Sequence, residues 1–151
     1  NNIVPETATL TGTIRTFDAA VRRSIHEKIR SIAQQTATAM GAVATVEIDP
    51  GVPVTFNDAA LTKQMVPTLE RVYGEGAVFE SPRVTGAEDF SFYQEQVPGF
   101  FFFIGARPPE LSAAEAIPNH SPFFYVDENA LAPAVRAMTQ LAIDYLNAGA
   151  R

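Results

Sequence analysis

The sequence of 151 residues predicts an α/β protein, and three observations predict that class. Short stretches alternate polar and apolar residues with the period of a β-strand. Other stretches carry apolar residues at helical spacing. A run of five consecutive apolar residues, Phe100–Ile104, is typical of a central strand that helices cover on both faces.

The first part of the chain has the pattern strand, helix, strand. Apolar and polar residues alternate strictly from Thr7 to Arg15, which predicts a strand with one covered face. Asp18 can cap a helix that carries an apolar stripe and stops at Gly41. A second alternating stretch follows over Ala42–Asp49, with Ala44, Val46 and Ile48 expected to face inward. We expect this half of a small two-layer unit to leave a sheet edge and a helix flank uncovered.

A turn-rich segment, DPGVPVTFND, separates this unit from the rest of the chain. We place a domain boundary inside it and predict domains over residues 1–52 and 53–151. A helix is then expected from Asn57 or Asp58 to Gly74. Pro67 inside it is expected to destabilise or bend one turn of this helix.

The second domain continues with short elements and ends in a long helix. We predict a loop over Val84–Ala87, helical turns over Asp89–Gln94 and the buried strand Phe100–Ile104. Asp127 can cap the final helix, and Pro133 lies in or near its first turn. The residues Leu131, Val135, Met138, Leu141 and Tyr145 are expected to line one face of that helix.

Composition excludes several classes of function. The formal net charge is −6, with 11 Lys and Arg against 17 Asp and Glu, which argues against nucleic acid as a partner. No apolar run approaches the roughly 18–20 residues that a membrane span requires. The absence of Cys excludes disulfides and thiolate metal ligands and is compatible with the cytoplasm, where we expect the protein. The start, NNIVPETATL, lacks a signal-peptide pattern and reads as an internal segment.

His120 is the first candidate for chemistry, although its residue type and spacing leave its role open. It follows the predicted buried strand by a polar loop, in the kind of position where functional groups collect in α/β sheets. An imidazole there could bind zinc or a similar ion, but one ligand does not make a site. A surface or capping role is the alternative.

Two other places in the sequence have both a structural and a functional interpretation, and the second histidine has only a structural one. In TGAEDFSFY, Glu88 and Asp89 suit the start of a helix, or Gly86 borders a ligand while a carboxylate orients a metal ligand. Arg15 is either a solvated charge at a strand end or a fork for a substrate carboxylate. His26 is interpreted as a surface residue.

Three ordered motifs cover essentially the whole chain: NNIVPETATLTGTIRTFD, TGAEDFSFYQEQVPGFFFFIG and NHSPFFYVDENAL. In this order they resemble the C-terminal part of the binuclear metal-dependent amidohydrolases and carboxypeptidases. That family of metallopeptidase-like hydrolases includes hippurate hydrolase, the N-acyl-amino-acid amidohydrolases (aminoacylases) and the auxin-conjugate hydrolases. The resemblance implies a zinc-peptidase-like catalytic α/β domain over residues 53–151. It also implies that residues 1–52 are half of an inserted α+β, ferredoxin-like lid through which the protein forms a homodimer.

The resemblance also implies roles for single residues. His120 matches a ligand of one of two divalent ions (Zn, Mn or Co), and Asn2, Arg15 and Gly86 match positions that bind or border the substrate. The expected substrate is an N-acyl amino acid, hippurate-like, or a peptide. The other metal ligands, the general base and a lid histidine of the family have no counterpart in this sequence. No catalytic residue is therefore assigned, and the chain alone is expected to be inactive.

Two other functions stay open at this stage. The chain could be a non-catalytic dimerisation or binding module that pairs through an exposed sheet edge. It could also belong to a metal-free acid–base enzyme that uses His120 with Glu88 or Asp89.

Overall fold

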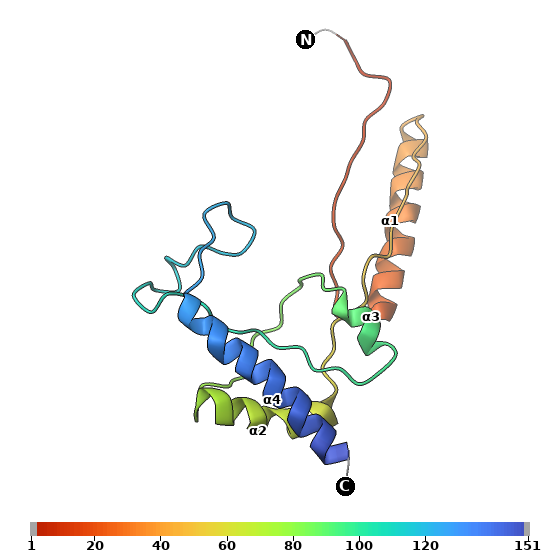
Figure 1. Cartoon of the computed structure of the whole chain (residues 1–151). Helices are drawn as coiled ribbons and strands as arrows, with labels where there is room; N and C mark the ends of the chain where they lie inside the picture. The colour runs from red at the N-terminus through yellow and green to blue at the C-terminus, as the bar shows by residue number, and fades with distance from the viewer. Residues whose placement is uncertain (1–2, 150–151) are drawn as a thin grey trace. The chain divides into compact units, whose positions relative to one another are not determined.

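The computed structural model describes residues 3–149 as helices joined by long extended and turn segments (Figure 1). The elements, in order, are α1 (Ala19–Ala39), α2 (Ala59–Tyr73), α3 (Phe90–Gln94), the short 3-10 helix η1 (Glu128–Ala130) and α4 (Leu131–Gly149). The chain divides into two compact units. Unit 1 contains the residues up to Thr55 together with Arg83–Phe92, and unit 2 contains Phe56–Pro82 and the residues from Tyr93 onward. No helix within the described range is long and apolar enough to cross a membrane.

The helix starts follow from three aspartates, as predicted. The carboxylates of Asp18, Asp58 and Asp127 accept backbone N–H groups of the following turn at 2.7, 2.8 and 3.0 Å. Each bond satisfies a donor that a helix start would otherwise leave free. Gly41 (φ 73°) and Gly74 (φ 97°) end α1 and α2 with a positive φ, which costs glycine little. The predicted limits of α1 and α2 are therefore confirmed, whereas Asp127 caps η1 and the final helix α4 begins only at Leu131.

The three predicted strands are not strands in this structure. Within residues 3–149, the segments Thr7–Arg15, Ala42–Asp49 and Phe100–Ile104 form no hydrogen-bonded ladder. The period-two pattern nevertheless survives in the middle segment, where Ala44, Val46 and Ile48 are half-buried and the residues between them are exposed. An alternating sequence fixes which side chains share a face, but a strand also needs a neighbouring strand to bond with.

The segment Phe100–Ile104 also differs from the prediction of burial on both faces. Its aromatic rings pair two residues apart: Phe100 stacks on Phe102 with ring centroids 5.5 Å apart, and Phe101 meets Phe103 edge-on at 5.3 Å. This spacing belongs to an extended backbone with rings on both sides. Phe103 is 67% exposed, so one of these sides is open.

The core of unit 2 is the contact between α2 and α4. On α2, Met65, Thr68 and Leu69 are buried. On α4, the buried residue is Ala137 rather than a member of the predicted stripe, of which Leu131, Val135, Met138 and Tyr145 stay exposed. A small side chain at a buried helix position lets a neighbouring helix approach closely, which is a physical reason for an alanine there. The predicted face of α4 is thus wrong by part of a turn.

Asn57 ties the start of α2 to the phenylalanine-rich segment. Its amide group donates to the Phe101 carbonyl and accepts the Phe101 N–H, both at 2.7 Å, so the side chain pairs with the backbone as a strand would. Beside it, the Asp58 N–H donates to the Gly99 carbonyl at 3.0 Å. Gly99 is buried, and a Cβ there would lie 2.5 Å from Cγ of Gln94, so no larger residue fits without a shift.

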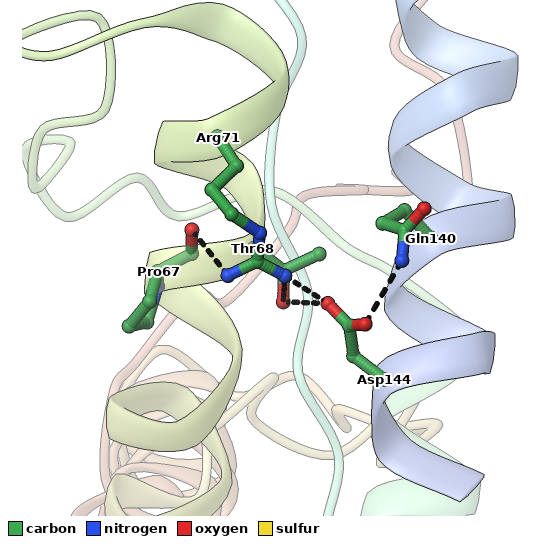
Figure 2. A network of polar contacts seen from close by, with 5 residues as sticks. All are labelled: Pro67, Thr68, Arg71, Gln140 and Asp144. Carbon is green, nitrogen blue, oxygen red and sulfur yellow. Dashed lines mark hydrogen bonds and ion pairs between the residues drawn. The ribbon is translucent and has the colours of Figure 1, made fainter. Parts of the chain in front are cut away.

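A polar network joins α2 to α4 beside the apolar contact (Figure 2). The buried Thr68 hydroxyl donates to Asp144 Oδ2 at 2.6 Å, and Gln140 Nε2 donates to Asp144 Oδ1 at 2.9 Å. Arg71 forms an ion pair with the same carboxylate and also donates to the Pro67 carbonyl at 3.1 Å. Asp144 is therefore the acceptor that links three donors from both helices. Pro67 itself does not interrupt α2.

Asp144 gives the helix pair an acid-sensitive stability. Hydrogen bonds from Thr68 and then Gln140, helped by Arg71, lower the pKa of Asp144 below its ordinary value of 3.8. A carboxyl group whose pKa falls on folding stabilises the protein above its unfolded pKa, and this stabilisation is lost as pH falls through the folded pKa. We expect Asp144→Asn to lower the melting temperature at pH 7 and to have less effect with each step below about pH 4. Thermal melts at several pH values measure this. The variant Glu95→Gln, at an exposed position, serves as control. An equal effect of Asp144→Asn on the melting temperature at all pH values would contradict this prediction.

Candidate functional site

A pocket of about 250 Å³ lies within unit 1. Its walls come from four parts of this unit: the segment Gly12–Phe17, the first turns of α1, the hinge Asp49–Thr55 and the loop Val84–Ala87. Two of the substrate-binding residues predicted from the sequence, Arg15 and Gly86, line this pocket together. The structure therefore brings two sequence-distant candidates to one place.

Arg15 is held in position by the backbone of the loop. Its Nη1 donates to the Thr85 carbonyl at 2.6 Å, across 70 residues of sequence. The ion pair present among the described residues joins Arg71 to Asp144, so no carboxylate there neutralises Arg15. A carbonyl orients a guanidinium group without neutralising its charge. The remaining N–H donors of the planar guanidinium group can therefore still bind an anion.

Two further basic residues line the same pocket, and sequence reasoning missed both. Arg22 Nη1 donates to the Val52 carbonyl at 2.8 Å and to the Pro50 carbonyl at 3.2 Å, which fastens the hinge to α1. His26, interpreted from the sequence as a surface residue, is half-buried and lines the pocket one turn further along α1. Their spacing of four residues on one helix is the signal that could have placed them on one face.

The loop that follows Gly86 leads into α3. Gly86 is exposed, and a Cβ built on it meets no atom within 4 Å, so the pocket is open at this point. Glu88 accepts the Phe90 N–H through its carboxylate at 3.3 Å and the Ser91 hydroxyl through its carbonyl at 2.6 Å. Glu88 therefore performs the helix-start role that its position in the sequence favoured.

His120 belongs to unit 2 and has an unusual backbone conformation. Its φ of 75° is the only positive value of a non-glycine residue in the described part of the chain. Histidine adopts this left-handed region more readily than most residues, although at a cost in free energy. The side chain is exposed in a turn in which the Ser121 N–H donates to the Pro118 carbonyl at 3.3 Å. Such outliers cluster at functional sites, which keeps His120 a candidate ligand.

The described residues do not form a complete metal site. Between residues 3 and 149, no three side chains of His, Cys, Asp or Glu come together in a way that could hold an ion. The exposed imidazole of His120 is chemically suited to be one ligand of a shared site, and no more follows from this chain's own donors. Asn2, the remaining predicted substrate contact, lies outside the described residues.

Comparison with known proteins identifies the class of this chain. Residues 3–144 match the model of the Peptidase family M20/M25/M40, so the chain belongs to this family. The match confirms the family resemblance found in the three motifs and is consistent with an α/β fold of the zinc-peptidase type.

Individual relatives come from all three domains of life. The chain is 34% identical over 148 residues to Thermostable carboxypeptidase 2 of Saccharolobus solfataricus, covering 97% of this chain and 36% of that protein. It is 33% identical to an N-acetylcysteine deacetylase of Bacillus subtilis, and the match covers 94% of this chain and 35% of that protein. It is 32% identical to an IAA-amino acid hydrolase of Arabidopsis thaliana, and the match covers 97% of this chain and 32% of that protein. The chain thus spans about a third of the length of these relatives, and no solved structure matches it significantly.

Proposed function

We propose that this chain is the C-terminal part of a metal-dependent amidohydrolase that cleaves the amide bond between an acyl group and an amino acid. The family match over residues 3–144 carries this proposal. The relatives are named as a carboxypeptidase, a deacetylase of an N-acetyl amino acid and a hydrolase of amino acid conjugates. All three names describe cleavage of a bond to an amino acid, and a hippurate-like N-acyl amino acid or a peptide is the matching substrate class.

Each candidate residue has a distinct role in this proposal. Arg15, with Asn2, holds the free carboxylate of the substrate, and the open backbone at Gly86 borders the same ligand. Holding the carboxylate fixes the scissile amide in position, which is a large part of catalysis by orientation. His120 is one ligand of a centre for two divalent ions such as Zn, Mn or Co. Such a centre lowers the pKa of a water and polarises the amide carbonyl when the ions are bound.

The chain by itself is expected to be catalytically silent. With Zn, Mn or Co added, the 151 residues should not release an amino acid from hippurate or N-acetyl amino acids, because the described donors do not complete a metal centre. The whole protein should show turnover under the same conditions. Amino acid release, followed by ninhydrin or liquid chromatography, measures both. Turnover by the chain alone would contradict the proposed division of the site, and inactivity of the whole protein would contradict the proposed function.

A second candidate function, a non-catalytic dimerisation module, is favoured by the exposure of α1. The helix contains no buried residue along Ala19–Ala39, and its apolar stripe includes the exposed Val21 and Ile32. A second copy of the chain could cover this face. Sedimentation with and without metal separates the two candidates, since a stable dimer that is indifferent to metal supports the module. In the amidohydrolase proposal a homodimer forms as well, but the whole protein also binds metal.

A further inference from the structure

The hinge Asp49–Thr55 begins with a turn whose shape is specified by its own residues. The Asp49 carboxylate accepts the Gly51 N–H at 2.8 Å, and Gly51 has a φ of 63°. Pro50 fixes its own φ, and glycine adopts the left-handed region at little cost. A Cβ added at Gly51 would meet no atom within 4 Å, so the backbone conformation, and not a lack of space, favours glycine here.

Arg22 binds this turn from α1. Its Nη1 donates to the Val52 carbonyl at 2.8 Å and to the Pro50 carbonyl at 3.2 Å, so one nitrogen bridges the two carbonyls on either side of Gly51. A charged donor forms stronger hydrogen bonds than a neutral one. The turn therefore has its shape from local interactions, whereas its position against α1 depends on Arg22.

The position of the turn affects the pocket of unit 1, because Arg22 connects two of the pocket walls. The wall Gly12–Phe17, which contains Arg15, directly precedes the Asp18 cap of α1. The hinge is another wall, and the Arg22 guanidinium group holds it to the first turns of the same helix. Without Arg22 the hinge would be free to move relative to Arg15.

We propose that Arg22 is a positioning residue for substrate binding, which holds the hinge where the pocket around Arg15 fits its ligand. The inference rests on the proposed function, in which Arg15 holds the substrate carboxylate. When the binding-competent conformation is only partly populated, the apparent affinity for a ligand falls in proportion to that population. Loss of Arg22 therefore weakens substrate binding. A bound substrate has already selected the held hinge, so it reacts at the usual rate.

The kinetics of the whole protein with hippurate test this role. We expect Arg22→Gln to raise KM about tenfold and to leave kcat within about twofold, since one charge-assisted hydrogen bond corresponds to roughly tenfold in an equilibrium constant. Arg22→Lys should keep KM within about threefold of the unchanged protein, because an ammonium group also donates to carbonyls. An unchanged KM in Arg22→Gln, or a loss confined to kcat, would overturn the inference.

Two further variants show whether the effect comes from the turn. Gly51→Ala keeps Arg22 but disfavours the left-handed conformation, so it should also raise KM at nearly constant kcat, even if Arg22→Gln fails to fold. Arg23→Gln removes the same charge at a neighbouring exposed position outside the pocket wall and should leave KM unchanged. An equal rise of KM in Arg23→Gln would assign the effect to net charge and overturn the inference.

Hydrogen exchange, measured by mass spectrometry on the whole protein, keeps this inference separate from the proposed function. Arg22→Gln should speed exchange in the hinge Asp49–Thr55 while the amides in the middle of α1 keep their protection. If the whole protein hydrolyses hippurate but Arg22→Gln changes neither KM nor this exchange, the inference is wrong and the proposed function stands. If the whole protein hydrolyses no N-acyl amino acid, the proposed function is wrong, and unchanged exchange in the hinge would still refute the role of Arg22.

Discussion

Replacing His120 with glycine is expected to remove bound metal from the whole protein while leaving the folding stability of the metal-free protein nearly unchanged. The residue has a φ of 75°, a conformation that costs a non-glycine residue roughly 1–2 kcal/mol and glycine almost nothing. Glycine also makes the unfolded chain more flexible, which opposes this gain by about 0.4–1 kcal/mol. The two effects offset each other within about 1 kcal/mol. Loss of the imidazole therefore becomes visible separately from loss of the fold.

The companion variant His120→Val separates chemistry from conformation. A β-branched residue is strongly disfavoured at positive φ, so this variant should be less stable than His120→Gly by about 1–2 kcal/mol. Both variants should lose metal and activity to the same extent. Loss of a residue that merely orients a ligand costs about 10–100-fold, so kcat/KM should fall by at least about 100-fold when a ligand itself is removed. Metal content by atomic absorption, thermal melts and hydrolysis rates supply the three readouts. Full metal content in His120→Gly would contradict the assignment.

Local features of the fold could be predicted from the sequence because their causes are local. Asp18 and Asp58 cap helices by bonding to N–H groups three residues away, and Gly74 ends α2 through its own φ. Each of these interactions is contained within one or two turns of chain. The pattern of residues near a helix end therefore determines the end, whatever the rest of the molecule does.

Contacts between distant segments could not be predicted in the same way. The alternation over Ala42–Asp49 correctly indicated which side chains share a face, but it carries no information on a pairing partner. The bond between Asn57 and Phe101 spans 44 residues, and a lone Asn before a helix more commonly signals a cap. The burial of Ala137 on α4 was missed because hydrophobicity alone ranks larger residues first.

In the candidate site, too, local chemistry could be predicted from the sequence and contacts between distant segments could not. The chemistry of Arg15 as a fork for a carboxylate follows from its residue type, but its Thr85 partner and the shared pocket with Gly86 follow only from the fold. His26 looked like a surface residue because charged neighbours surround it in sequence. In the structure His26 lines the pocket, because the segment Asp49–Thr55, which Arg22 holds by hydrogen bonds, passes along that side of α1.

Truncating Leu69 to alanine is expected to be the most destabilising single change in unit 2. The side chain is 3% exposed on α2, the helix that contacts α4, and few other large apolar side chains are buried in the described chain. A buried leucine replaced by alanine loses about 2–5 kcal/mol from transfer and cavity terms together. Protein domains are stable by only about 5–15 kcal/mol, so this loss is a large fraction of the total. Urea unfolding followed by circular dichroism measures it.

Leu146 supplies the matched control for this prediction. It is the same residue type on the partner helix α4, but it is 70% exposed. Leu146→Ala removes the same atoms without opening a cavity, so its effect should stay within about 0.5 kcal/mol. Because α2 and α4 also share the Asp144 network, Leu69→Ala should weaken the polar contacts as well, and the double variant with Asp144→Asn should lose less than the sum of the two singles. Additive losses would show that the apolar contact and the polar network hold the helices together independently. Equal losses for Leu69→Ala and Leu146→Ala would contradict the assignment of the core to this helix pair.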